Sequence, residues 1–228
     1  MRAVAINTEK KTVTVEGGVL WADVDTAAEK YDLACIGGTV NHTGVGGLTL
    51  GGGLGFLAGK VGLVIDNLLE AEVVLADGSI VTTSATENKD LFWAIRGAGV
   101  SFGIATKFVY QAYEQKSLVW GGTLVSPPTQ LAEVVAFMNT LLEKSQGEAS
   151  AIMGFGVPHT ALQPCIFSAV FYNGPKEEAE KFFEPLLSLN QLANMTSMVP
   201  YSTMNSLFND RLQAGFRRKY ITKVYCLC

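Results

Sequence analysis

Residues 37–55 read GGTVNHTGVGGLTLGGGLG, and nine of these nineteen positions are glycine. Glycine loses more conformational freedom on folding than any other residue, so a run this dense lowers stability unless a bare backbone is needed. The usual needs are positive φ angles or a ligand lying against the main chain, and exposed backbone N–H groups can surround a phosphate. A flexible linker is the alternative, but linkers are polar and rich in Gly and Ser. The apolar residues interleaved here favour a structured loop: Val45, Leu48, Leu50, Leu54 and Phe56.

Two familiar phosphate-binding loops fit this stretch poorly. A P-loop requires Gly-Lys followed by Ser or Thr, whereas the Gly-Lys pair at 59–60 is followed by valine. The dinucleotide fingerprint G-x-G-x-x-G finds only a weak match over residues 53–58, where alanine takes the last position and another glycine precedes the motif. The glycine loop therefore belongs to a different class of site.

Composition excludes several classes of partner. The 228 residues carry a formal net charge of −4, so nothing indicates binding to nucleic acid or to an anionic membrane. No apolar run approaches the ~18 residues of a membrane span. Charged residues make up 17% of the chain, against about 25% in average soluble proteins. Together with a mean hydropathy of +0.25, this predicts large buried surfaces.

Cysteine spacing and the first residues bear on metals and targeting. The four cysteines show no metal-ligand spacing such as C-x-x-C, so no metal site is expected; they are Cys35, Cys165, Cys226 and Cys228. Met1-Arg2 leads directly into an alternating strand–turn–strand pattern, so no signal peptide is expected in this chain. The compartment is not assigned.

Hydrophobic periodicity predicts strands and helices in both halves of the chain. In residues 1–115 it predicts a β-hairpin over 3–16, a helix over 20–31, the glycine loop, strands over 68–75, 80–83 and 102–110, and a short helix around 91–95. In residues 116–228 it predicts strands over 118–125, 151–157 and 165–171, and helices over 127–143 and 175–189. The β-α-β-β-α order of the second half suits an antiparallel sheet covered by helices.

The helix over 20–31 is predicted to be amphipathic. Its apolar face is formed by Leu20, Val24, Ala27 and Ala28. Its polar face is formed by Asp23, Asp25, Glu29 and Lys30.

Five motifs occur in the order found in one family of flavoproteins. They are T-G-V-G-G-L-T-L-G-G-G-x-G from Thr43, G-L-x-x-D-N from Gly62, A-D-G-S from Ala76, D-L-F-W-A-I-R-G-A-G from Asp90 and F-G-I-A-T from Phe102. Residues 3–113 thereby resemble the flavin domain of the FAD-linked oxidases of the berberine-bridge-enzyme type, in the superfamily of vanillyl-alcohol oxidase and p-cresol methylhydroxylase (PCMH). The pattern is most similar to that of fungal members in secondary metabolism.

The resemblance implies an α+β fold in two parts. Residues 1–115 would form the later portion of an incomplete PCMH-type FAD-binding domain. Residues 116–228 would form part of a substrate domain built on an antiparallel sheet, since 198–210 and 215–220 also resemble the family. Relatives continue beyond both ends, which predicts a chain truncated at both ends.

The resemblance also implies which residues meet FAD. The pyrophosphate and ribityl chain would pass along the backbone of Thr43, Gly44, Val45, Gly46 and Gly47. Further contacts would come from Gly55, Gly62, Leu63, Gly103 and Ile104. For Ile104 a place in the core of a strand is the competing interpretation.

Attachment of the flavin is expected to be non-covalent. Relatives bind it through a histidine in an R-x-G-G-H-like motif, which is absent here, where the only histidines are His42 and His159. Members with a second link carry cysteine at the position of Val40 and often histidine at that of Leu48. Thr43 aligns with the residue that controls oxygen access, and its small side chain suits O2 as the acceptor.

No catalytic residue is assigned from the sequence. The pKa of a histidine would suit proton transfer by His42, but an exposed or backbone-bonded loop histidine competes with that role. An exposed turn competes for His159, and packing competes for Tyr201. Arg96 is expected to support the loop structurally.

The implied reaction is oxidation of a small molecule. A base would remove a proton from an alcohol or amine, hydride would pass to flavin N5, and O2 would reoxidise the flavin to give H2O2. Two alternatives stay open: a non-catalytic fragment or pseudoenzyme with weak or no FAD binding, and a flavin-dependent reductase.

Overall fold

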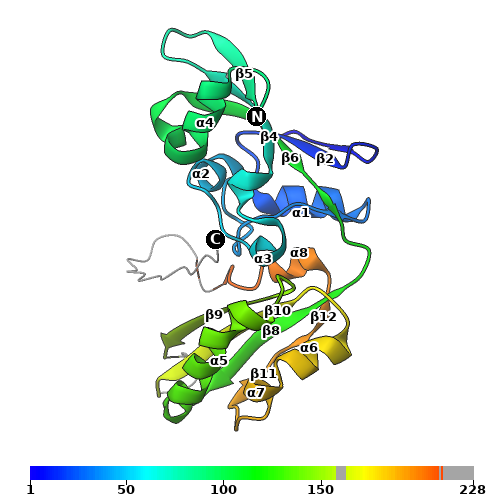
Figure 1. Ribbon diagram of the computed structural model, residues 1–228, viewed down its shortest axis with the longest axis vertical. Helices are drawn as coiled ribbons and strands as arrows, with labels where there is room; N and C mark the ends of the chain where they lie inside the picture. Colours follow the sequence, from blue (N-terminus) through cyan, green and yellow to red (C-terminus); the bar gives the residue numbers. More distant parts are fainter. Residues whose placement is uncertain (158–162, 211, 213–228) are drawn as a thin grey trace.

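Two antiparallel sheets organise the computed structural model, which describes residues 1–157, 163–210 and 212 (Figure 1). The first sheet has the strand order β1-β2-β6-β4-β5. Its strands are β1 (Val4–Asn7), β2 (Thr12–Glu16), β4 (Leu68–Val74), β5 (Ile80–Ser84) and β6 (Ile104–Gln111). A separate two-stranded sheet pairs β3 (Leu33–Ala34) with β7 (Tyr113–Glu114). We call these strands and the helices between them the first body.

Short helices surround the first sheet. They are α1 (Trp21–Glu29), α2 (Val45–Leu50), α3 (Ala58–Val61) and α4 (Lys89–Ala98), with 3-10 turns η1 (Val64–Asn67) and η2 (Gly99–Ser101). The core lies where β2 and β6 pair, because Val13 faces Tyr110 and Val15 faces Phe108 in register, and all four are buried. Trp21 of α1 closes this core, with its ring centroid 5.5 Å from that of Tyr110.

The second body is built on the second sheet, whose strand order is β11-β8-β10-β9, with β12 also on β8. Its strands are β8 (Val119–Ser126), β9 (Ala149–Gly156), β10 (Cys165–Tyr172), β11 (Ala193–Asn194) and β12 (Ser197–Val199). Its helical elements are η3 (Pro128–Gln130), α5 (Leu131–Lys144), α6 (Lys176–Phe182) and α7 (Glu184–Leu187). The α8 turn (Tyr201–Met204) follows β12 and lies between the two bodies (Figure 1).

The two faces of the second sheet have different neighbours. On one face Trp120 of β8 stacks on Phe183, with ring centroids 5.3 Å apart, in the apolar cluster beneath α5 and α6. On the other face Phe171 of β10 stacks on Phe56 of the first body, with ring centroids 5.5 Å apart. This alternation follows from the period of two along a strand and joins both bodies through one apolar core.

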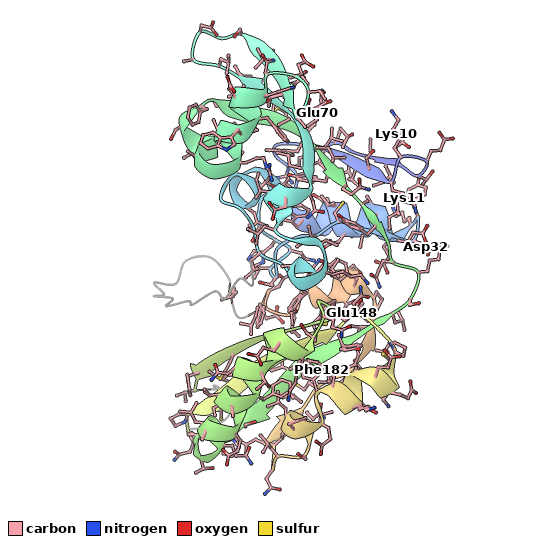
Figure 2. The ribbon with its side chains drawn as sticks, in the orientation of Figure 1. Lys10, Lys11, Asp32, Glu70, Glu148 and Phe182 are labelled. Atoms are coloured by element: carbon pink, nitrogen blue, oxygen red, sulfur yellow. The ribbon has the colours of Figure 1, made fainter. Side chains whose placement is uncertain are left out.

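Polar contacts reinforce the junction between the bodies. The Ser150 hydroxyl donates to the Phe56 carbonyl at 3.1 Å, and Lys60 pairs with Glu148 at 2.9 Å. Figure 2 shows Glu148 at the level where the first body meets the second sheet. Gly59 and Gly147 pack backbone to backbone there, so a Cβ on Gly147 would lie 2.5 Å from the Gly59 carbonyl oxygen.

Most predicted elements are confirmed, with three corrections. Residues 45–50 of the glycine loop form helix α2, where only loop was expected. The helix expected over 175–189 is divided into α6 and α7, because Pro185 lacks the N–H that a continuous helix needs and instead begins a new one. The helix around 91–95 continues through Gly97 and Ala98 before it ends.

Candidate functional site

The glycine loop is tied along its inner side to the start of α1. The N–H of Trp21 donates to the Thr43 carbonyl at 3.1 Å, and the N–H of Ala22 donates to that of Asn41 at 2.8 Å. The N–H of Val45 donates to the Val19 carbonyl at 2.9 Å, and the Val45 side chain is fully buried. These bonds fix the backbone of residues 41–45 and leave the opposite side of the loop turned outward.

Gly44 and Gly47 are glycines that the fold itself does not require. Both are exposed, both have ordinary negative φ angles, and a Cβ on either would meet no atom within 4 Å. Gly47 even costs about 1 kcal/mol of helix stability relative to alanine. The N–H groups of Gly46 and Gly47 lie in the first turn of α2, where no intrahelical acceptor is available. A bare, donor-rich backbone of this kind fits the approach of a pyrophosphate.

Several other glycines of the loop have packing or conformational reasons. Gly52 and Gly53 have φ angles of +100° and +75°, which favour glycine. Their carbonyls accept the N–H groups of Ile65 and Val64, both at 2.9 Å. A Cβ on Gly55 would overlap the carbonyl oxygen of Gly37. The second half of the loop is therefore shaped by contacts with η1 and with its own beginning.

The turn at Gly62 and Leu63 is held by a carboxylate and an arginine. Gly62 has a φ of +80°, and the N–H of Leu63 donates to Asp66 Oδ2 at 2.9 Å. Arg96 Nη2 lies 3.2 Å from Asp66 Oδ1, and its guanidinium stands 5.7 Å from the centre of the Phe92 ring. This is the structural support expected of Arg96.

Gly103 and Ile104 begin β6 beside the end of β4. Gly103 has a φ of +145°, and a Cβ there would lie 2.5 Å from the Val74 carbonyl oxygen. Ile104 is 70% exposed, so it does not lie in the core of its strand. Trp93 and Val100 are also exposed, at 80% and 84%, on α4 and η2. Large apolar side chains thus lie open on this part of the first body.

One packing contact connects this strand end with the glycine loop. A Cβ on Gly99 would lie 2.6 Å from Leu50 Cδ2, so η2 rests closely on the end of α2. Figure 1 shows α4 and α2 side by side on the first body. The end of α2, which follows segment 43–47, is therefore in contact with η2, which precedes segment 103–104.

The side chains considered for proton transfer lie in different environments. His42 is exposed on the loop. Tyr201 is buried in the core, its ring centroid 6.2 Å from that of Phe171, and burial raises the pKa of its phenol well above the usual value. The structure thus gives Tyr201 the packing role. His159 lies outside the described residues.

Asp25 corrects the predicted polar face of α1. It was expected to face solvent, but it is only 5% exposed. Asp25 stands four residues after Trp21 and three before Ala28, both fully buried, and these spacings place it on their face of the helix. Burial is the largest cause that raises the pKa of Asp25, to about 7; the amide of Asn205 opposes the rise, and Glu29 adds to it. In the sequence, the four-residue spacing between Asp25 and Trp21 was the signal that could have indicated the burial of Asp25.

Three further properties concern the described ranges 1–157, 163–210 and 212. Within them, no three His, Cys, Asp or Glu side chains lie close enough together to hold a metal ion. No helix there is long and apolar enough to cross a membrane. Cys35 and Cys165 are both buried and both free thiols.

Comparisons with known proteins agree with the geometry of the loop. Residues 1–84 match the family described as the FAD binding domain. The FAD-linked oxidoreductase pgmH of Aspergillus terreus is 42% identical over 208 residues, which cover 89% of this chain and 42% of that protein. A FAD-linked oxidoreductase of Dictyostelium discoideum is 32% identical over 218 residues, which cover 95% of this chain and 47% of that protein.

Solved structures show the same fold. The 6-hydroxy-D-nicotine oxidase of Arthrobacter nicotinovorans superposes with a TM-score of 0.81 at 29% identity, covering 93% of this chain and 47% of that one. Xylooligosaccharide oxidase from Myceliophthora thermophila gives 0.77 at 30% identity, covering 92% and 44%. A variant of the berberine-bridge-enzyme-like protein 1 of Physcomitrella patens gives 0.81 at 26% identity, covering 95% and 46%.

The chain spans less than half the length of these relatives. Over that length the motifs, the strand order and the glycine loop occur together in one α+β unit. The comparisons therefore support the family that the motifs indicated, the FAD-linked oxidoreductases with a PCMH-type FAD-binding domain, to which the berberine-bridge-enzyme-like proteins are related.

Proposed function

We propose that this chain supplies the glycine-loop side of the FAD site of an oxidase that acts on a small molecule in secondary metabolism. The observation that carries the proposal is the bare backbone at Gly44 and Gly47, where nothing in the fold requires glycine. FAD, when bound, would accept a hydride at N5, and the reduced flavin would pass two electrons and two protons to O2 to give H2O2. The neighbours named as oxidases of 6-hydroxy-D-nicotine and of xylooligosaccharide support a small organic substrate.

The residues proposed to meet the flavin divide into two groups. Thr43 to Gly47 would bind phosphate and ribityl oxygens through their backbone, since bonds to α1 fix this segment in place. Ile104 would offer apolar surface, because its side chain is open. The others would shape the backbone around the ligand, because contacts within the fold already determine their conformation: Gly55, Gly62, Leu63 and Gly103.

The proposal assigns residues 1–115 to the FAD-binding domain and residues 116–228 to the substrate domain. The flavin would be held non-covalently, because valine occupies position 40, where members with a second link carry cysteine, and because His42 is not in the motif that links to flavin. Precipitating the flavin-loaded chain with acid tests the attachment. Yellow colour should appear in the supernatant, and colour retained in the pellet would overturn the non-covalent assignment.

Titration with FAD tests the site itself. Flavin fluorescence should fall as FAD binds to the wild type. Gly47→Val should weaken this binding at least about tenfold, since a single obstructed contact of this kind costs on the order of 1.4 kcal/mol or more. The urea midpoint of that variant should be unchanged, because valine costs the helix no more than glycine does.

Gly154→Val is the matched control for Gly47→Val. Gly154 lies on β9, and a Cβ there also meets no atom within 4 Å, so the substitution is equally well accommodated by the fold. It should leave FAD affinity as in the wild type. Equal FAD binding by Gly47→Val and Gly154→Val would show that the glycine loop is not part of the FAD site.

A second candidate is a chain that binds FAD without oxidising a substrate. It is favoured by the surroundings of the two side chains that were considered as catalytic bases. Tyr201 is buried in the core, and His42 has no hydrogen-bond partner within the described part of the chain. Hydrogen peroxide assays on the FAD-loaded chain, with amines, alcohols and oligosaccharides as substrates, separate the two candidates. Turnover supports the oxidase, and bound flavin with no peroxide from any class supports the second candidate.

A further inference from the structure

A buried polar cluster joins α1, α8 and the glycine loop. Asn205, at the end of α8, is completely buried, and its Nδ2 lies 3.2 Å and 3.1 Å from the two carboxyl oxygens of Asp25 on α1. Tyr201 of the same turn is 6% exposed and is influenced by the charge of Asp25. Together Asp25, Asn205 and Tyr201 place three polar side chains in an interior that is otherwise apolar.

The cluster connects directly to the glycine loop through Asn41. The carbonyl of Asn205 accepts the N–H of Asn41 at 2.8 Å. One turn further on, Asn209 Nδ2 donates to Asn41 Oδ1 at 2.7 Å. The carbonyl of Asn41 in turn accepts the N–H of Ala22 from α1. Asn41 is therefore held from both sides, three residues before Gly44, and a shift of Asn205 must move the loop.

The hydrogen bonds of the cluster are incomplete when Asp25 is ionised. Asn205 Oδ1 is buried and accepts no hydrogen bond from the described residues. An ionised carboxylate can only accept, so it offers no donor to Asn205 Oδ1, whereas a protonated carboxyl offers one O–H. A buried acceptor without a donor is unfavourable. Protonation of Asp25 removes a buried charge that has no counter-ion, while Asn205 Nδ2 can still donate to the carboxyl group.

The charged and titratable groups around Asp25 do not supply a counter-ion. Glu29 comes from α1 itself and accepts the Ser202 hydroxyl of α8 at 2.7 Å. The Cys35 thiol, on the segment after β3, is buried, and burial raises its pKa. Lys116 and Asp32 line the small cavity beside Asp25 and Tyr201, where Lys116 lies 3.7 Å from Glu114. No ion pair among the described residues includes Asp25.

We propose that Asp25 and Asn205 form a proton-dependent clamp that positions the glycine loop through Asn41. The clamp is closed when Asp25 carries a proton and loosens when Asp25 ionises. Both residues act through the backbone of the loop, so they are positioning residues that do not touch the flavin. The consequence for FAD rests on the proposed function, but the clamp itself is a property of the chain alone.

The pH range of the clamp follows from the two states of Asp25. In the closed state its pKa is about 7, and in an opened state it returns toward the ordinary value of 3.8. Opening therefore releases a proton between these values and becomes easier as the pH rises, by up to about tenfold per pH unit. Above about pH 7 Asp25 is ionised in both states, so the opening equilibrium levels off.

Amide hydrogen exchange on the full chain without FAD tests the clamp. After correction for intrinsic exchange, protection of peptides covering residues 37–47 should fall by up to about tenfold per pH unit from pH 5 to 7 and then stay constant. Peptides from β8 and β10 should show no such change. If the protection of residues 37–47 in the wild type does not depend on pH, the proposal is wrong, and no variant is needed to show this.

Three variants identify the groups involved. Asp25→Asn keeps the shape without the titration, so its loop should show protection that does not vary with pH. Asn205→Ala should show, already at pH 5, the low protection that the wild type reaches above pH 7. Ser202→Ala removes the neighbouring bond to Glu29 across the same interface and should keep the wild-type profile. A pH response that persists in Asp25→Asn would contradict the clamp.

FAD titration at pH 5.5 and 7.5 separates the clamp from the proposed function. If the wild type binds FAD more tightly at the lower pH, and Asp25→Asn binds it equally at the two pH values, the clamp and the proposed flavin site are both supported. No FAD binding at either pH, with the exchange profile as expected, would reject the flavin site and leave the clamp intact.

Discussion

At the scale of single residues, Gly47 and Gly103 show that glycine serves two opposite purposes in this chain. Space is open around Gly47, so nothing in the described fold requires its lack of a side chain. Space is closed around Gly103, where the Val74 carbonyl occupies the place of a Cβ and φ is +145°. The first glycine is one that the fold does not require, and the second is a feature of the strand pairing.

This contrast predicts different stability effects of alanine at the two positions. Gly103→Ala should lower the free energy of unfolding by about 2 kcal/mol or more, because alanine must be strained or must push β4 away. Gly47→Ala should raise it by up to about 1 kcal/mol, because alanine favours the helix. Urea denaturation followed by circular dichroism measures both. A Gly103→Ala protein as stable as the wild type would mean that β6 does not approach β4 this closely.

A second residue-scale prediction concerns the buried pair of Thr49 and Tyr110. Their oxygens are 2.6 Å apart, and the Thr49 hydroxyl also lies 2.8 Å from the Val45 carbonyl. Tyr110→Phe removes the pairing and should cost about 1 kcal/mol of stability. Phe108 and its neighbours keep the ring packing in this variant. Thermal unfolding of Tyr110→Phe beside Tyr31→Phe, an exposed control, would measure the loss.

At the scale of elements, α1 carries a carboxylate whose protonation should govern stability. Because the pKa of Asp25 is raised to about 7 in the folded state, folding takes up a proton between pH 3.8 and 7. Its contribution to stability is therefore complete below pH 3.8 and is lost as the pH rises through 7. The slope is at most about 1.4 kcal/mol per pH unit.

Comparing wild type with Asp25→Asn isolates this contribution. The difference in free energy of unfolding between the two proteins should favour the wild type more at pH 5 than at pH 8. Urea midpoints at several pH values between 4.5 and 8.5 would measure it. A difference that is the same at every pH would show that Asp25 titrates normally in the folded protein.

The same helix shows what the sequence could and could not predict about elements. The hairpin over 3–16 and the long strands were predictable because alternation and turn residues act locally. Asp25 was assigned to the polar face because it is charged, although its spacing to Trp21 indicated burial; its partner, Asn205, is 180 residues away along the chain. Helix α2 was missed because it contains two glycines, which lower helix propensity; bonds to Val19 and the packing of Val45 and Thr49 hold it instead.

The candidate site was predictable to a similar extent. The glycine loop and its motifs were evident, since they depend on local residue types. The sequence did not distinguish Gly44 and Gly47 from the glycines that the packing requires. This distinction depends on which atoms lie within 4 Å of each position in the folded chain. The open side chain of Ile104 also depended on the register between β6 and β4.

At the scale of the whole molecule, the two bodies share a junction that should make them unfold together. Phe171 is fully buried and contacts the rings of both Phe56 and Tyr201. Phe171→Ala should cost about 3–5 kcal/mol, as expected for a large side chain removed from a core. It should also separate the unfolding into two steps, because the second body keeps an apolar cluster of its own under α5 and α6, while the cluster that spans the junction loses this ring.

Calorimetry of Phe171→Ala and of Phe182→Ala tests this coupling. Phe182 packs on Phe137 and Phe183 within the second body (Figure 2), away from the junction. Its removal should lower the melting temperature and keep one transition. If both variants melt in a single step, the bodies are coupled by more than the Phe171 contact.

The distribution of the three tryptophans gives the molecule an optical signature. Trp21 is buried in the first body, Trp120 is buried in the second, and Trp93 is 80% exposed on α4. Emission near 350 nm, quenched by iodide, should therefore come from Trp93 alone, while the two blue-shifted emitters resist the quencher. Replacing Trp93 by phenylalanine would leave one shielded fluorophore in each body, so that the red shift on unfolding would report the loss of both cores without a background from the exposed ring.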